Sequence, residues 1–105
     1  MSAAAREQCW IIRGVEVQPP PANADFERIR ELHHRFIDEL DDDGILVAHG
    51  ATRDENGARS GTGLIVIRAA TRAEALTIAA REPYVAHGVR TLDLIPWQMQ
   101  RGRKG

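Results

Sequence analysis

The hydrophobic residues of the chain fall into four short runs separated by two stretches with helical spacing. The four runs, rich in Ile, Val and Leu and bounded by Pro, Gly, Asn or Asp, predict strands over residues 9–17, 45–51, 61–69 and 89–97. Turn-forming residues between the second and third runs, among them Asp54 and Gly57, predict that these two strands form an antiparallel hairpin.

A long helix is predicted between the first two strands. Three- and four-residue spacing relates the members of one stripe, which are Phe26, Ile29, Leu32, His33, Phe36, Ile37 and Leu40. Asn23 or Asp25 can cap the first turn by accepting its free amide protons, and three prolines stand just before them. Gly44 favours the left-handed backbone that follows a helix end, so the helix is expected to run to about Asp42.

A second helix is predicted before the last strand. Thr71 and Glu74 have the spacing of a capping box, in which each side chain satisfies a free amide at a helix start. Pro83 disfavours helical backbone in the residue before it, so this helix must end by Glu82. Residues 83–88 then predict one further turn, with proline first and a glycine past its end.

The resulting order, βαββαβ, predicts an α+β fold of the ferredoxin-like type, an antiparallel sheet with both helices on one face. We expect one domain over residues 9–98, a flexible leader over 1–8 and a basic tail over 99–105. The strands place Ile, Val and Leu on both faces of the sheet. The face without helices needs a cover, and another copy of the chain is the simplest one, so we predict a homodimer.

Composition excludes several classes of protein. The chain has 105 residues, 43% hydrophobic and 28% charged, with a formal net charge of −1. These values indicate a soluble globular domain with neither a membrane nor a nucleic acid as partner. The single cysteine, Cys9, closes no internal disulfide, and no signal peptide is evident, so we expect a cytoplasmic protein.

His33 and Glu82 are the first candidates for chemistry. His33 falls near the middle of the apolar stripe, where an imidazole needs a partner. It is either a core histidine bonded to a backbone carbonyl or an acid–base group tuned by burial and a nearby carboxylate. Glu82 either caps the turn that follows it or reaches Nδ1 of His33 and orients the ring. His34 points toward the polar side of the helix.

His49 and His87 could border the same cavity as that pair, and three histidines with a carboxylate could hold Zn²⁺ or Fe²⁺. The spacings match no local metal motif, so we predict no metal. Tyr84 either donates its hydroxyl to a ligand or packs its ring against the second helix. Residues 60–63 lack the context of a nucleophile elbow, a dinucleotide fingerprint or a P-loop, which leaves no nucleotide cofactor implied.

Several of these segments together resemble the YCII-related family. The first group comprises Arg30, His33, Gly44, Leu46, Ala48 and Gly50; the second comprises Glu82, Pro83, Tyr84, Val85, Gly88 and Val89; the third comprises Ile95, Pro96 and Trp97. The resemblance covers roughly residues 10–97. It implies a dimeric α+β barrel with a pocket around a catalytic histidine, His33, and an aspartate in whose place Glu82 stands. Arg30 is then the residue expected to bind an anionic group.

The chain departs from the family pattern at the carboxylate, which is longer by one methylene, and at His49 and His87, where small residues are usual. One branch of the family removes HCl from a chlorinated hydroxyhydroquinone, and muconolactone isomerases share the barrel. The resemblance therefore implies a cofactor-independent lyase or isomerase of small hydroxylated or quinonoid compounds, with Arg30, His49, Tyr84 and His87 around the substrate. The alternative is a non-catalytic dimeric module that binds a small metabolite or supports another enzyme.

Overall fold

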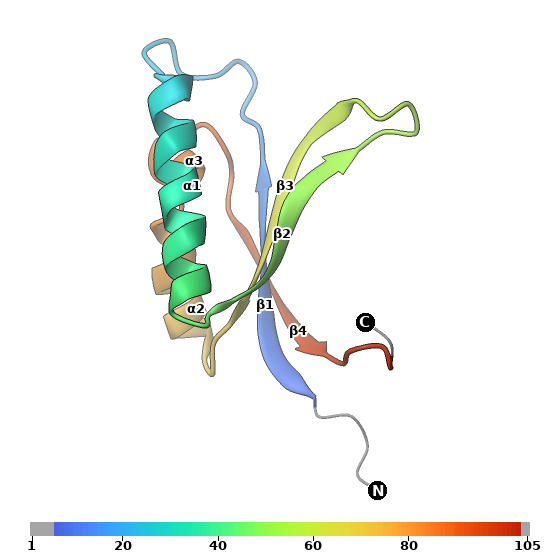
Figure 1. Ribbon diagram of the computed structural model, residues 1–105. Helices are drawn as coiled ribbons and strands as arrows, with labels where there is room; N and C mark the ends of the chain where they lie inside the picture. The colour runs from blue at the N-terminus through green and yellow to red at the C-terminus, as the bar shows by residue number, and fades with distance from the viewer. Residues whose placement is uncertain (1–5, 104–105) are drawn as a thin grey trace, which may run out of the picture.

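The computed structural model describes residues 6–103, which form a four-stranded antiparallel sheet with three helices on one face (Figure 1). The elements are β1 (Glu7–Val15), α1 (Phe26–Asp42), β2 (Leu46–Arg53), β3 (Arg59–Arg68), α2 (Arg72–Ala80), α3 (Pro83–Ala86) and β4 (Asp93–Met99). The strand order is β2-β3-β1-β4, with every pair antiparallel. The predicted ferredoxin-like α+β fold is confirmed; this single chain does not close into a barrel.

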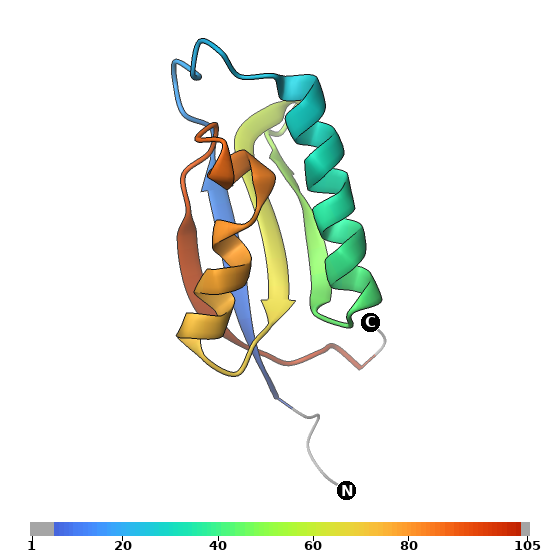
Figure 2. The same ribbon diagram turned by 90° about the vertical axis from the view of Figure 1, so that its left-hand side faces the viewer.

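The helices lie in two groups over the same face of the sheet. Figure 2 shows α1 running along the β2 side, with α2 and α3 along the β4 side. The predicted hairpin is present, since β2 and β3 pair in antiparallel register with irregularities after Leu46 and after Ala51. No helix within residues 6–103 is long and apolar enough to span a membrane.

Each strand boundary differs from the predicted one by one to four residues, and the two differences at the starts of β1 and β4 have a clear cause. β1 begins at Glu7, because the strand continues its pairing with β4 as far as Met99. Two residues of the predicted leader and one of the predicted tail are therefore part of the sheet, while residues 1–5 and 104–105 lie outside the described residues. β4 begins at Asp93 instead of residue 89, because the amides of Val89 and Arg90 donate to the carbonyl of Tyr84.

The ends of α1 follow the capping predictions. At the start, the Asp25 side chain accepts a hydrogen bond of 3.1 Å from the amide of Arg28. At the end, Gly44 adopts a φ of 72°, and its amide donates to the carbonyl of Asp41 while Ile45 donates to that of Leu40. These bonds satisfy carbonyls of the last turn that would otherwise lack partners.

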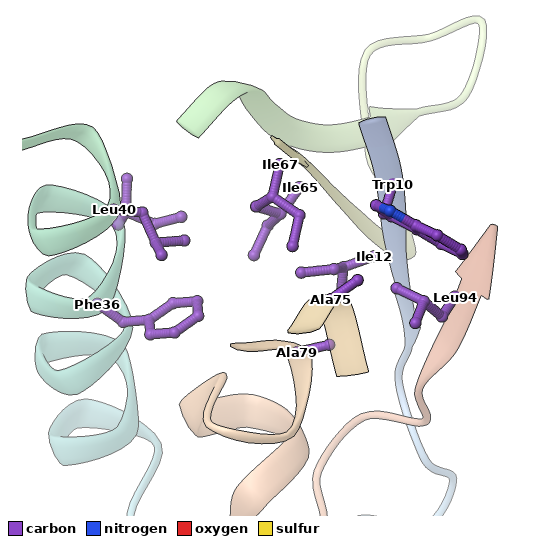
Figure 3. Packing of buried hydrophobic residues seen from close by; sticks show 10 residues of the cluster. Trp10, Ile12, Phe36, Leu40, Ile65, Ile67, Ala75, Ala79 and Leu94 are labelled. Atoms are coloured by element: carbon purple, nitrogen blue, oxygen red, sulfur yellow. The ribbon is translucent and has the colours of Figure 1, made fainter. Parts of the chain in front are cut away.

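The hydrophobic core lies between the C-terminal half of α1, the middle of the sheet and α2 (Figure 3). α1 contributes Phe36 and Leu40, and the sheet contributes Trp10, Ile12, Ile65, Ile67 and Leu94. α2 contributes Ala75 and Ala79, both fully buried. Because these two side chains are small, α2 can pack closely against the strands. The core therefore fills one end of the layer between helices and sheet.

Candidate active site

A cavity occupies the other end of that layer, where the large side chains of the core stop. Along β1 the residues that face the helices are Trp10 and Ile12, followed by Gly14; along β3 they are Ile67 and Ile65, followed by Gly63. Gly14 and Gly63 pair directly across the two strands. Because this pair has no side chains, there is room over it for the Arg90 side chain and, beside that, for a cavity of about 250 Å³ between the sheet, α1 and the α3 turn.

His33 and Glu82 meet at the wall of this cavity. Nδ1 of His33 lies 2.6 Å from Oε1 of Glu82, slightly shorter than the roughly 2.7–2.9 Å typical of a charge-assisted hydrogen bond. The His33 side chain is 14% exposed and that of Glu82 only 3%. Glu82 is also the one buried charged residue among residues 6–103. Of the two arrangements left open by the sequence, the structure therefore has the imidazole bonded to a carboxylate.

The position of Glu82 is fixed by the short helix that follows it. Its second oxygen, Oε2, accepts a bond of 3.3 Å from the amide of Val85, so Glu82 caps α3 and contacts His33 at the same time. Pro83 occupies the first position of α3, and Gly88 closes the turn with a φ of 73°. A carboxylate held from both sides has little freedom to leave the imidazole.

This arrangement determines which nitrogen of His33 is available for chemistry. An ionised carboxylate only accepts hydrogen bonds, so Nδ1 carries the hydrogen whenever Glu82 is ionised. Nε2 is then the unprotonated nitrogen of the neutral ring, and no hydrogen bond within residues 6–103 engages it. Such a ring can accept a proton at Nε2 while the carboxylate stabilises the positive charge that develops.

Of the four other predicted site residues, three line this cavity and one does not. Arg30, His49 and Tyr84 line the cavity, and the ring of Tyr84 lies 4.8 Å from that of His33. The ring of Tyr84 thus lies against His33 of α1. His87 is exposed and lines a separate groove beside Phe36, so the prediction that it borders the His33 cavity is wrong. The α3 turn carries it away from Glu82.

Sequence reasoning missed three residues that also line the cavity: His34, Arg59 and Arg90. His34 was assigned to the polar side of the helix, and it is exposed, but its ring lies 5.7 Å from that of His33 at the mouth of the cavity. The sequence did not predict Arg59 at the cavity, because its position depends on the register of the β2–β3 pairing. It did not predict Arg90 there, because its position depends on the turn that follows Tyr84. No local motif marks either of them.

The remaining titratable candidates are not gathered at the site. Within residues 6–103, no three His, Cys, Asp or Glu side chains lie close enough together to hold a metal ion. Cys9 is completely buried in β1, and its burial, with a smaller contribution from Glu7, raises the pKa of its thiol. A thiol in such surroundings is a poor nucleophile.

Comparisons with known proteins identify a family and a solved structure of similar fold. A sequence model described as the YCII-related domain matches residues 16–98. The fold is similar to that of 5-chloro-2-hydroxyhydroquinone dehydrochlorinase (TftG) from Burkholderia phenoliruptrix AC1100, solved in complex with 2,5-dihydroxybenzoquinone. The TM-score is 0.56 at 12% identity, over 91% of this chain and 98% of the other. A comparison with curated proteins finds no match.

Proposed function

The chain belongs to the YCII-related domain family, and on that premise we propose that it is a cofactor-independent lyase or isomerase of small hydroxylated or quinonoid compounds. His33 is the general base and Glu82 is the residue that orients it. The observation that carries this proposal is the contact of 2.6 Å between them at the wall of a cavity large enough for a small ring. The fold shared with a dehydrochlorinase supports the same class of chemistry.

In the proposed reaction, Nε2 of His33 takes a proton from a ring hydroxyl or an acidic carbon of the substrate. The electron pair left behind moves into the ring system of the substrate. In an isomerase, His33 returns the proton to another atom; in a lyase, the electron pair expels an anionic leaving group and the proton is released later. The carboxylate of Glu82 stabilises the imidazolium that forms. A positioned base of this kind contributes a factor of about 10² to 10⁴ in rate.

The test is an assay of the purified protein on chlorinated and unchlorinated hydroxyhydroquinones, each with and without a carboxyl group on the ring. Release of chloride, or exchange of substrate hydrogens for deuterium, is the readout. We expect His33→Gln to lower the rate by about 10² to 10⁴. His87→Gln is the matched control, because His87 lies outside the cavity, and it should leave the rate unchanged. Equal catalysed rates in wild type and His33→Gln would show that His33 is not the base. No rate above the uncatalysed reaction in the wild type would instead support the alternative, a binding module without catalysis.

We propose that a second copy of the chain covers the sheet face opposite the helices. Ile11, Val66, Ile95 and Trp97 alternate with core residues, so they lie on that face, where no described helix covers them (Figure 1). Ile95 and Trp97 are 37% and 41% exposed. Removal of such side chains from water favours self-association. The dimer implied by the family resemblance would remove them from water. The buried thiol of Cys9 is compatible with the predicted cytoplasmic location.

A further inference from the structure

Three arginines from three different segments surround the cavity beside the His33–Glu82 pair. They are Arg30 of α1, Arg59 of β3 and Arg90, which precedes β4. The same three line an adjoining hollow of about 540 Å³. Across residues 6–103, none of them has a carboxylate oxygen within 4.0 Å, whereas the arginines that form ion pairs lie elsewhere. Three guanidiniums therefore lie at the cavity with no ion pair to a carboxylate of the described residues.

Arg90 is the most firmly positioned of the three. Its guanidinium carbon lies 4.0 Å from the centre of the Tyr84 ring, and its amide donates to the Tyr84 carbonyl over 3.0 Å. A Cβ added at Gly63 would come within 2.5 Å of Nη1 of Arg90, and one at Gly14 within 3.2 Å of its Cδ. The paired glycines thus provide the space in which the Arg90 side chain crosses the sheet, half-buried.

The charge balance of the cavity favours an anionic ligand. Its lining includes three guanidiniums and a single carboxylate, that of Glu82, which His33 already engages. Glu16 and Glu27 line only the adjoining hollow, so the first cavity is the more positive of the two. The chain as a whole has a net charge of −1, which makes this local excess of positive charge a property of the site.

The chemistry of Arg90 indicates which anion fits. A guanidinium stacked on an aromatic ring keeps its N–H groups at its edge, in its own plane. A planar carboxylate matches this edge with two parallel hydrogen bonds, which is the preferred pairing of arginine with carboxylates. Arg30 and Arg59, which line the same cavity, add charge that attracts the same group.

We propose that Arg90 binds a carboxylate of the ligand, and that the substrate is a small hydroxylated or quinonoid carboxylic acid. The reaction assigned to this substrate rests on the proposed function; the binding of the carboxylate does not. His33 and Arg90 then act on two ends of one ring, the first on an acidic hydrogen and the second on the carboxylate.

The experiment compares two probes of similar shape, the anion 2,5-dihydroxybenzoate and the neutral 2,5-dihydroxybenzamide, by calorimetry on the full chain. We expect the acid to bind about 10- to 100-fold more tightly than the amide, as one charge-assisted contact provides. Arg90→Gln should remove this preference, and Arg90→Lys should restore part of it by returning the charge without the fork. Arg28→Gln, which removes an equal charge outside both cavities, should retain it.

Gly63→Ala tests the position of Arg90 without removing it. The added methyl group meets the far end of a flexible side chain, so the strand can fold while the guanidinium must move. We expect weaker binding of the acid and unchanged binding of the amide. An undiminished preference for the acid in this variant would overturn the role of the glycine pair.

Three results would overturn the carboxylate site: equal affinity for the two probes, binding of neither at millimolar concentration, or a preference that survives in Arg90→Gln. Binding of inorganic phosphate without binding of the acid would also overturn it. His33→Gln separates this inference from the proposed function. If His33→Gln still prefers the acid to the amide, and neither the wild type nor any variant shows turnover, the enzymatic proposal fails and the carboxylate site stands.

Discussion

His33 and Glu82 are 49 positions apart in the chain, yet Nδ1 of one lies 2.6 Å from Oε1 of the other. α1 presents the imidazole from the middle of its buried stripe, and the first residue before α3 presents the carboxylate. Glu82 therefore serves two purposes, as the cap of a short helix and as the partner of an imidazole. Substitutions that separate these two purposes give the sharpest tests of the site.

The first prediction concerns the tautomer of His33. In the wild-type protein, the neutral ring should carry its hydrogen on Nδ1, because Glu82 accepts from that nitrogen. Nitrogen chemical shifts of the ring, measured by NMR, distinguish the two tautomers. In Glu82→Gln the amide can accept or donate, so the preference for the Nδ1–H form should weaken. The exposed ring of His87 is the internal control and should not change between the two proteins; an Nε2–H ring at His33 in wild type would contradict the geometry.

The second prediction separates capping from pairing. Glu82→Asp keeps a carboxylate that can cap α3, since aspartate is a favourable capping residue, but it withdraws the oxygen from His33 by one methylene. We expect a small loss of stability and a clear loss of activity. Glu82→Ala removes both contacts, and should cost about 1.5–3 kcal/mol in free energy of unfolding as well as activity. Chemical denaturation and the chloride or deuterium assay measure the two effects, and equal activity of wild type and Glu82→Asp would show that the close contact is not needed.

Much of the fold and the central pair were accessible from the sequence for local reasons. The 3.6-residue period alone places His33 on the buried side of α1, and the sequence of Glu82, Pro83 and Gly88 alone marks a capped turn. Helix ends at Asp25 and Gly44 were equally local. The distance between His33 and Glu82 could not be predicted from the sequence, because it depends on how α3 packs against α1.

The errors arose where position depends on backbone bonds made at a distance. Residues 89–92 have strand composition, but the Tyr84 carbonyl takes the amides of Val89 and Arg90, which turns Arg90 toward the cavity. His87 follows Glu82 by five residues, and at 100° per residue it points about 140° away from it around the helix axis. Arg59 reaches the cavity from the far end of the β2–β3 hairpin, and the irregular register of that hairpin was not visible in the sequence.

The third prediction concerns Cys9. Burial raises the pKa of its thiol in the folded protein above the unfolded value, so the thiolate is disfavoured in the fold. The contribution of the protonated Cys9 thiol to the free energy of unfolding is fully present below the pKa of the unfolded chain. It is lost as pH rises through the pKa of the folded protein. We expect a thiol reagent at mildly alkaline pH to modify the native protein at the rate at which it opens, and the denatured protein at once. Fast modification without loss of structure would contradict the buried position.

The fourth prediction tests the dimer. The proposed interface is the sheet face that carries Ile95 and Trp97, so Trp97→Glu places a charge among side chains that would otherwise be removed from water. We expect the wild-type chain to sediment as a dimer and Trp97→Glu as a monomer, with the far-ultraviolet circular dichroism of both unchanged. Leu76→Glu is the matched control, because Leu76 is 46% exposed on α2, on the helix side of the sheet, and this variant should remain dimeric. A wild-type monomer, or a dimer that survives Trp97→Glu and dissociates in Leu76→Glu, would place the interface elsewhere.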